Sequence, residues 1–470
     1  MTYLIETYGC QMNKAESAAL EMLFRERGWE PWQPTSAALE ALFRERGWEP
    51  WQPTPSSLET PFAPDFVLIN TCSVRITAEN RAWGRIDHWA AEKTRLGREG
   101  RRLVLAVTGC MAERMKKEIR VRQPAVDHVI GTFQKQAFGL VVDAASKGLR
   151  LAEVEESPSF VFADSYHEPS SFRSFLPIMH GCDNFCTYCI VPHIRGRETS
   201  RDPESILAEL EALESQGVRE VTLLGQNVNS YRWEGRGERL DFPGLLSLVA
   251  GRLRDRRETG IRWVRFLTSH PKDLSDEAIA VIAREPLYCR HIHLPVQAGS
   301  DAILKAMNRK YDRAAYLALI ERMRAALPDL SLTTDLLVGF PGETEADLEE
   351  TLDLMRRVRY SYAFMYHFNP REGTPAAKMQ NRVPEKDKKA RLARVIELQK
   401  EISTAMLQAR IGAVEEVLVE DLSRRRKSEV LARTARDEMV VFAADASRIG
   451  SFARVRLESL SGNTFRAVEL

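Results

Sequence analysis

The chain has 470 residues, of which 44% are hydrophobic and 28% charged, and its formal net charge is +1. This is an ordinary soluble composition with room for two or three domains, and no apolar run reaches the roughly 18 residues of a membrane span. The first ten residues, MTYLIETYGC, lack the basic start and apolar core of a signal peptide. Seven cysteines favour a cytoplasmic protein that keeps thiolates for metal over a disulfide framework.

Short apolar runs of strand length alternate with helical patterns over residues 1–150. The strands are expected at Tyr3–Thr7, Phe66–Asn70, Leu103–Val107 and Val126–Ile130, and the helices at Lys14–Arg27, Val74–Lys93, Met111–Arg122 and Gln134–Ser146. This alternation predicts an open parallel α/β sheet, which we assign to an N-terminal domain of residues 1–150.

Three cysteines follow the expected strands of this domain. Cys10, Cys72 and Cys110 each come two or three residues after a strand end. In a parallel sheet these loops open on one edge, where ligands bind in open α/β folds. The placement predicts that the three thiols converge on a metal cluster. The alternative is three buried structural cysteines, which are common in protein cores.

A 19-residue tandem repeat interrupts the domain. Residues 17–35 and 36–54 match at 18 of 19 positions. The one difference is Met22 in the first copy and Ala41 at the equivalent position of the second. Two copies are too few for a solenoid, and an α/β crossover has room for one such helix. We expect one copy to pack on the sheet and the other to be a surface excursion.

Residues 151–172 have mixed charge and two prolines, which indicates a linker. Strand and helix patterns then resume as far as Arg371, within a second domain of residues 173–400. Six strands are expected at Phe175–His180, Glu220–Leu224, Trp263–Thr268, His291–Pro295, Ser331–Gly339 and Tyr362–Phe368. Six parallel β/α units can close into a partial (β/α)6 barrel, whose active site lies at the C-terminal ends of its strands.

The loop after the first barrel strand carries Cys182, Cys186 and Cys189, in the pattern Cys-x3-Cys-x2-Cys. Three thiolates cannot supply the four ligands of a [4Fe–4S] cluster, so one iron would stay open for a small molecule. Structural zinc is the alternative, with His180 or His193 as a fourth ligand.

The last segment, residues 401–470, contains short β-like runs at Glu416–Glu420, Met439–Phe442, Ala453–Leu457 and Thr464–Val468. They predict a small antiparallel β-barrel after a charged helix over Asp387–Arg410. From Lys378 onward the chain has 19 Lys and Arg against 14 Asp and Glu, and residues 424–427 read RRRK. This run is either a solvated turn or a contact for phosphates.

These motifs together resemble a known family. Cys-x3-Cys-x-aromatic-Cys is similar to the cluster loop of radical S-adenosylmethionine (SAM) enzymes, and GCDNFCTYCIVPHIRGRETSR resembles their methylthiotransferase branch. YGCQMN at residues 8–13 and LLGQNVNSY at residues 223–231 point to the MiaB-type tRNA methylthiotransferases. The C-terminal segment resembles the RNA-binding TRAM domain.

The resemblance implies two [4Fe–4S] clusters and SAM as cofactors. Cys182, Cys186 and Cys189 would hold the catalytic cluster, and Cys10, Cys72 and Cys110 an auxiliary one. SAM contacts are expected at the ends of three strands, although glycines there can also be simple turn residues. The expected contacts are Gly225, Gln226, Asn227, His293, Pro295, Gln297, Asp335 and Gly339.

The implied reaction adds a methylthio group to C2 of N6-isopentenyladenosine next to the anticodon, at position 37 of tRNA. One SAM methylates a sulfur at the auxiliary cluster, and a second is cleaved to the radical that removes hydrogen from C2. We expect a monomer that binds the tRNA anticodon loop and a reductant such as flavodoxin or ferredoxin. Arg195, Arg197 and Arg201 either steer phosphates or form a salt-bridged rim.

Two alternatives stay open. The same chemistry could act on threonylcarbamoyladenosine or on an aspartate of a ribosomal protein. The chain could also be a non-catalytic iron–sulfur RNA-binding or electron-transfer protein.

Overall fold

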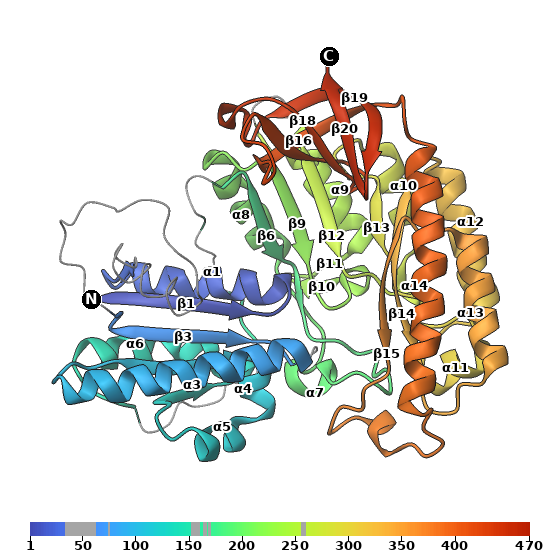
Figure 1. Cartoon of the computed structure of the whole chain (residues 1–470). Coiled ribbons are helices and arrows are strands. Elements are labelled where there is room, and N and C mark those ends of the chain that lie inside the picture. Colours follow the sequence, from blue (N-terminus) through green and yellow to red (C-terminus); the bar gives the residue numbers. More distant parts are fainter. Residues whose placement is uncertain (33–62, 74–75, 152–159, 163–166, 168–170, 255–259) are drawn as a thin grey trace. The chain divides into compact units, whose positions relative to one another are not determined.

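The structure is a computed structural model of the whole chain and describes residues 1–32, 63–73, 76–151, 160–162, 167, 171–254 and 260–470 (Figure 1). The chain divides into two compact units, Met1–Tyr166 and His167–Leu470. The division falls inside the stretch 151–172 that the sequence analysis interprets as a linker. The second unit contains both the predicted barrel domain and the predicted C-terminal domain.

The first unit is built on a parallel sheet, as predicted, but the sheet has five strands because the short β2 was missed. Its strand order is β2-β1-β3-β4-β5, and every pairing is parallel. The strands are β1 (Thr2–Tyr8), β2 (Glu30–Pro31), β3 (Phe66–Thr71), β4 (Val104–Gly109) and β5 (His128–Ile130).

Helices cover both faces of this sheet because successive residues of a strand point to opposite sides. Phe66 and Leu68 of β3 pack under α1 (Gln11–Arg25) and α6 (Phe138–Ser146), which follows the short η1 (Thr132–Ala137). Val67 and Ile69 face α3 (Ile76–Arg98), α4 (Cys110–Arg114) and α5 (Lys116–Arg122). The helix predicted over Met111–Arg122 is thus two helices, separated at Met115.

The first copy of the repeat belongs to this core. Leu20 and Phe24 lie on the buried face of α1, and Trp29 packs beside them. The Phe24 ring is fully buried, and its centroid lies 4.5 Å from that of Tyr3 and 5.0 Å from that of Phe66. The second copy, residues 36–54, lies outside the described residues, so its expected place at the surface stays a prediction.

The second unit begins with the predicted partial barrel, made of two three-stranded parallel sheets. An isolated bridge between Val264 and Tyr288 lies where the two sheets adjoin. The sheets are β6-β9-β12, formed by Arg173–Pro177, Glu220–Leu224 and Trp263–Leu267, and β13-β14-β15, formed by His291–His293, Ser331–Val338 and Tyr362–His367.

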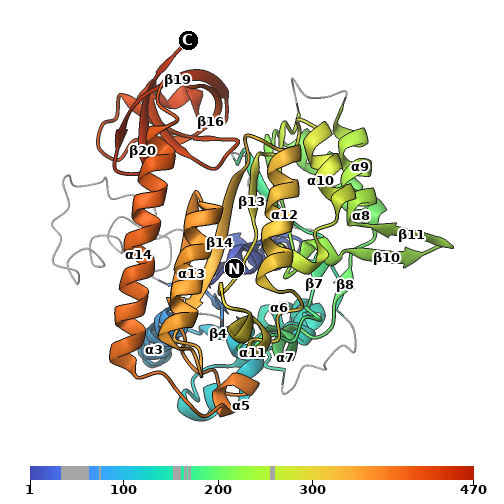
Figure 2. The ribbon, with the colours of Figure 1, turned by 90° about the vertical axis from the view of Figure 1, so that its right-hand side faces the viewer.

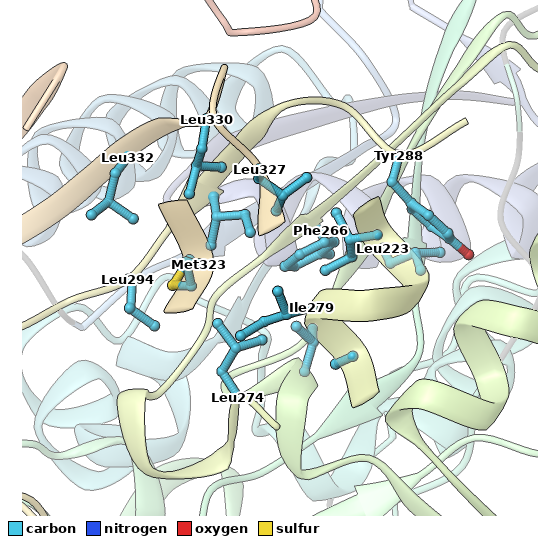
Figure 3. Packing of buried hydrophobic residues seen from close by; sticks show 14 of the residues in the cluster. Leu223, Phe266, Leu274, Ile279, Tyr288, Leu294, Met323, Leu327, Leu330 and Leu332 are labelled. Atoms are coloured by element: carbon cyan, nitrogen blue, oxygen red, sulfur yellow. The ribbon is translucent and has the colours of Figure 1, made fainter. Parts of the chain in front are cut away.

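Six helices alternate with these strands: α8 (Pro203–Ser215), α9 (Phe242–Leu253), α10 (Asp276–Arg284), α11 (Asp301–Ala306), α12 (Arg313–Ala326) and α13 (Glu345–Val358). Side chains of Asp202, Asp241, Ser275, Asp312 and Thr344 cap five of them by accepting from backbone N–H groups. The apolar faces of strands and helices meet in one large core, part of which is shown in Figure 3. A hairpin of β10 (Arg232–Gly235) and β11 (Glu238–Asp241), which was not predicted, precedes α9.

The long helix α14 (Glu385–Gln408) packs on β15 and runs beside α13 toward the C-terminal barrel (Figure 2). That barrel is closed, in the order β16-β17-β18-β20-β19. Its strands are β16 (Val414–Leu422), β17 (Glu429–Thr434), β18 (Met439–Ala443), β19 (Phe452–Ser461) and β20 (Thr464–Glu469). The small barrel is as predicted, but the sequence analysis missed β17, and β18 pairs with β20 in parallel.

Buried polar and apolar contacts join this small barrel to the N-terminal ends of the larger barrel's strands. Arg265 of β12 is bound to Glu220 at 2.8 Å and also donates to the carbonyl of Thr434. Cys289 is buried in a cluster with Trp263 and Leu418, which gives this cysteine a structural role. Within the described residues, no helix is both long and apolar enough to cross a membrane.

Candidate functional site

The loop with the three closely spaced cysteines lies between β7 (Met179–His180) and α7 (Val191–Arg195), at the C-terminal end of the first barrel strand. Gly181 opens the loop with φ +80°, and a Cβ there would lie 2.0 Å from the carbonyl oxygen of Arg197. Only glycine fits both conditions. The amide of Cys182 donates to Gly196 O at 3.1 Å, which closes the base of the loop.

The segment after α11 holds this loop in place. The Thr187 amide donates to Met307 O at 3.0 Å, and its hydroxyl donates to Ala306 O at 2.9 Å. Asn308 Nδ2 donates to Phe185 O at 2.8 Å. The backbone of the cysteine loop is therefore fixed by hydrogen bonds that involve none of the thiols.

The three thiols are withdrawn from solvent. Cys182 and Cys186 are 9% and 7% exposed, and Cys189 is half-buried. Burial raises the pKa of Cys182 to about 11 and that of Cys189 to about 12. Metal ligation requires thiolates, so bound cations would have to offset the cost of burying their charge.

Two side chains direct N–H groups at the sulfurs. Asn184 Nδ2 lies 3.5 Å from Cys182 Sγ, and Arg309 Nη1 lies 3.3 Å from Cys186 Sγ. Such donors stabilise thiolate ligands. Neither residue was predicted from the sequence, although Asn184 lies inside the cysteine motif itself.

The donor set fits an iron–sulfur cluster better than zinc. In the described part of the chain, no three His, Cys, Asp or Glu side chains are arranged around a point where one ion could sit. His193 is exposed on α7, whereas His180 is buried. Three thiols on one loop, with N–H groups directed at two of the sulfurs, are a donor set that fits an iron–sulfur cluster.

A group of buried polar atoms lies beyond the ends of the neighbouring strands β9 and β12. Within the described residues, no hydrogen-bond partner is found for Gln226 Oε1, Asn227 Oδ1, both amide atoms of Asn229, Ser269 Oγ or His270 Nε2. Native proteins leave few such groups unsatisfied, so a polar ligand is expected there. Gln226 and Asn227 are two of the predicted SAM contacts.

Gly225, in the same loop, also has a packing reason to be glycine. A Cβ there would lie 3.0 Å from Met179 Cβ, directly before the cysteine loop. Backbone bonds from Gly225 N to Leu267 O and from Val228 N to Thr268 O hold the β9 and β12 loops together. Ser269 and His270, which follow the end of β12, were not predicted from the sequence.

The remaining predicted contacts lie on β13 and β14. His293 Nδ1 is 3.0 Å from Thr333 Oγ1, and its Nε2 is 3.6 Å from Asp335 Oδ2. Gln297 has φ +74°, and its backbone N–H donates to Asp335 O at 2.9 Å. Pro295 O accepts from Arg309. Three of the predicted residues, His293, Gln297 and Asp335, are thus in direct contact, and Arg309 joins Pro295 to Cys186.

Gly339 has a structural explanation. Its φ is +70°, and a Cβ would lie 2.5 Å from Lys388 Cγ on α14. Its amide donates to Glu343 Oε1 at 2.8 Å. The close approach of α14 is therefore enough to require a glycine here, with or without a ligand.

The three arginines after the cysteine loop differ in role. Arg201 is buried and bound to Glu209 and Ser205, so it is part of the salt-bridged rim. Arg195 is also buried. Arg197 has a side chain that is 77% exposed and is bound to Asp183 at 2.8 Å, so of the three it is the one placed to meet a phosphate.

In the first unit, the other three cysteines follow adjacent parallel strands. Tyr8 pairs with Thr71 and Thr71 with Gly109, so the strands end level with one another. Cys72 and Cys110 follow their strands directly, and Cys10 lies two residues after β1. The strand-end loops therefore meet at one edge of the sheet, as expected.

A polar network supports this edge. Asn13 Nδ2 donates to Asn70 Oδ1 at 3.0 Å, and Asn70 Nδ2 donates to Ser17 Oγ at 2.9 Å. The amide and thiol of Cys10 both donate to Asn13 Oδ1. The network connects the start of α1 to the end of β3 and so positions two of the three cysteine loops.

The basic run 424–427 lies in the loop between β16 and β17, and all four side chains are exposed. Arg426 is bound to Glu429 at 3.4 Å. Arg424, Arg425 and Lys427 face solvent.

Comparison with known proteins agrees with this architecture. Residues 176–355 match the Radical SAM superfamily, residues 36–131 match Uncharacterized protein family UPF0004, and residues 408–468 match the TRAM domain. A protein from Treponema denticola, called tRNA-2-methylthio-N(6)-dimethylallyladenosine synthase, is 46% identical over 99% of both chains. A protein of the same name from Carboxydothermus hydrogenoformans is 40% identical over 97% of this chain and 96% of its own.

Solved structures support the fold. The radical SAM methyltransferase TsrM from Kitasatospora setae matches 80% of this chain and 75% of its own, with a TM-score of 0.58 and 14% identity. The cobalamin-dependent radical SAM enzyme OxsB matches 85% of this chain and 56% of its own, with a TM-score of 0.50 and 12% identity.

Proposed function

Because the chain belongs to the family of tRNA-2-methylthio-N(6)-dimethylallyladenosine synthases, within the radical SAM superfamily, we propose that it transfers a methylthio group to C2 of N6-isopentenyladenosine at position 37 of tRNA. The observation that carries this proposal is identity of 40–46% to relatives of that name along the whole chain. A substrate assignment from a partial match would be weaker.

Cys182, Cys186 and Cys189 hold the catalytic [4Fe–4S] cluster in this proposal. When bound, the cluster and SAM supply a one-electron cleavage that generates a carbon-centred radical for removing hydrogen from C2. The protein's part is to hold three thiolates on a rigid loop, to leave the fourth ligand position to SAM, and to exclude water by burial. The hydrogen bonds of Thr187 and Asn308 supply that rigidity.

The residues at the strand ends would hold SAM. Gln226 and Asn227 have buried side-chain oxygens that could accept from its cationic amino group, and Gly225 lets the loop approach Met179. The second three-stranded sheet carries His293, Gln297 and Asp335 at the same end of its strands. We add Ser269 and His270 to the predicted SAM contacts, because their side chains also have buried polar atoms that need a hydrogen-bond partner.

Cys10, Cys72 and Cys110 hold a second [4Fe–4S] cluster that carries the sulfur to be transferred. Support comes from the level ends of β1, β3 and β4 and from the Asn13–Asn70 network behind them. Three cysteines at one edge leave an iron open for a sulfur species, as in the catalytic loop.

The substrate RNA is bound partly by the C-terminal barrel, where Arg424, Arg425 and Lys427 contact phosphates. The target base must leave its stack in the anticodon loop to present C2. We further propose that the protein is a cytoplasmic monomer and takes its electrons from a flavodoxin or ferredoxin.

The test is nucleoside mass spectrometry of tRNA from a strain that lacks its own synthase and expresses this chain. The 2-methylthio form of N6-isopentenyladenosine should appear with the natural chain and not with Cys182→Ala. Methylthio groups on threonylcarbamoyladenosine instead would reassign the substrate, and no methylthio nucleoside with a fully loaded protein would refute the proposal.

A further inference from the structure

Arg309 lies between α11 and α12 and contacts the cysteine loop. Its Nη1 is 3.3 Å from Cys186 Sγ, its Nη2 donates to Pro295 O at 2.8 Å, and its Nε donates to Tyr311 OH at 3.0 Å. The side chain is 9% exposed. The guanidinium is therefore locked in place, with one N–H pair directed at a cysteine sulfur.

The charge of Arg309 has no carboxylate partner among the ion pairs of the described residues, whereas the equally buried Arg265 is paired with Glu220. A guanidinium is always protonated, and burying it without an anion is costly. The thiolate of Cys186 in a bound cluster is the anion that its geometry provides.

We propose that Arg309 sets the reduction potential of the catalytic cluster through a charge-assisted hydrogen bond to Cys186 Sγ. This inference rests on the assignment of Cys182, Cys186 and Cys189 to that cluster in the proposed function. Hydrogen bonds to sulfur and nearby charge are two of the factors that determine cluster potentials.

The sign of the effect follows from charge. The cluster accepts one electron from an external protein reductant, so its negative charge grows by one unit on reduction. A fixed cation beside a ligand sulfur stabilises the reduced form more than the oxidised form. Arg309 therefore raises the potential and makes the cluster easier to reduce.

A purely structural role can be separated from this one. The cysteine loop is also held by Thr187 and by Asn308, so its position does not depend on Arg309 alone. Thr187→Val is a matched control, because it removes the hydroxyl bond to Ala306 O from the loop and leaves all three contacts of Arg309 in place.

The experiment is a redox titration of the anaerobically reconstituted full-length protein, followed by electron paramagnetic resonance. Cys10, Cys72 and Cys110 are first changed to Ala in all samples, so that one cluster is observed. In Arg309→Gln, the ratio of reduced to oxidised cluster at a fixed potential should fall at least tenfold, a shift of about 59 mV for a one-electron couple. Arg309→Lys should shift less, because it keeps the charge, and Thr187→Val should match the parent.

An unchanged potential in loaded Arg309→Gln would overturn this role and leave the proposed function standing. An equal shift in Thr187→Val would also overturn it, because loosening of the loop would then be the cause. Loss of iron from both Arg309 variants would show that the residue holds the loop and does not tune the cluster. If the parent itself held no SAM-responsive cluster, the cluster assignment and the proposed function would fail together.

Discussion

The amide of Cys72 donates a 2.9 Å hydrogen bond to the carbonyl oxygen of Tyr8, and this bond joins the ends of β3 and β1. It places the first residue after one strand against the last residue of its neighbour. Cys10 and Cys72, which are 62 positions apart in the sequence, therefore lie on adjacent loops. The sequence repeat inserted between them does not disturb this relationship.

The two cysteine sets should load independently. Changing Cys182, Cys186 and Cys189 to Ala should leave about half of the iron and abolish SAM cleavage, because the catalytic thiolates are gone. Changing Cys10, Cys72 and Cys110 should also leave about half but preserve cleavage and abolish methylthio transfer. Iron analysis with chromatography of 5′-deoxyadenosine would check both, and loss of all iron from either triple variant would contradict independence.

Gly109 should be irreplaceable at the edge that carries the N-terminal cysteines. Its φ is +92°, and a Cβ would lie 2.3 Å from Thr71 O. Gly28 is the control, because its φ is +71° but no atom lies within 4 Å of such a Cβ. Gly109→Ala should lower the free energy of unfolding by about 2–5 kcal/mol, and Gly28→Ala by about 1–2 kcal/mol. Equal losses in urea titrations would show that crowding at Thr71 is unimportant.

The strand and cysteine positions could be predicted because local signals determine them. Apolar runs of strand length identify β1, β3 and β9, and thiols directly after them can only lie at the strand ends. Arg309 and His270 could not be predicted in this way. Packing between segments far apart in the sequence places each of them near the cysteine loop or the strand ends, and neither lies in a spacing motif.

Contacts between distant segments also explain why strand β17 was missed and why the sequence left two interpretations of Gly339 open. β17 has the sequence EVLART, whose short alternation is weak without its neighbours β16 and β18. Gly339 follows a strand, as a ligand contact would, but only the packed structure brings Lys388 against it. Which copy of the repeat packs could not be predicted either, since the copies differ at one position.

The two repeat copies should contribute unequally to the free energy of unfolding. Phe24 is fully buried against Tyr3 and Phe66, so Phe24→Ala should lower the free energy of unfolding by about 3–5 kcal/mol. Phe43→Ala, at the equivalent position of the second copy, should change it by less than about 0.5 kcal/mol. Deleting residues 36–54 should leave iron loading unchanged. Loss of the auxiliary cluster on that deletion, or equal effects of the two Phe variants, would refute the assignment of the packed copy.

Three buried histidines should make the protein sensitive to acid. Burial, with Arg309 and Lys272 nearby, lowers the pKa of His270 from 6.5 to about 2. Burial also lowers the pKa values of His128 and His291 to about 4. Below pH 6.5 the unfolded chain therefore binds protons that the folded chain does not. Stability is complete above that pH and falls by about 1.4 kcal/mol per pH unit for each histidine as the pH drops toward the folded-state values.

Urea unfolding of the metal-free protein at pH 7.5, 6.0 and 5.0 would measure this slope. His291→Gln should reduce the slope of stability against pH by the contribution of one proton, because the glutamine does not titrate. This holds whatever the effect of the variant on stability at pH 7.5. His291 is the better target, since it lies on β13 and its Nε2 is 2.9 Å from Thr333 Oγ1, an atom that a glutamine amide can also reach. Parallel pH dependences for the variant and the natural chain would show that His291 is already protonated in the folded state.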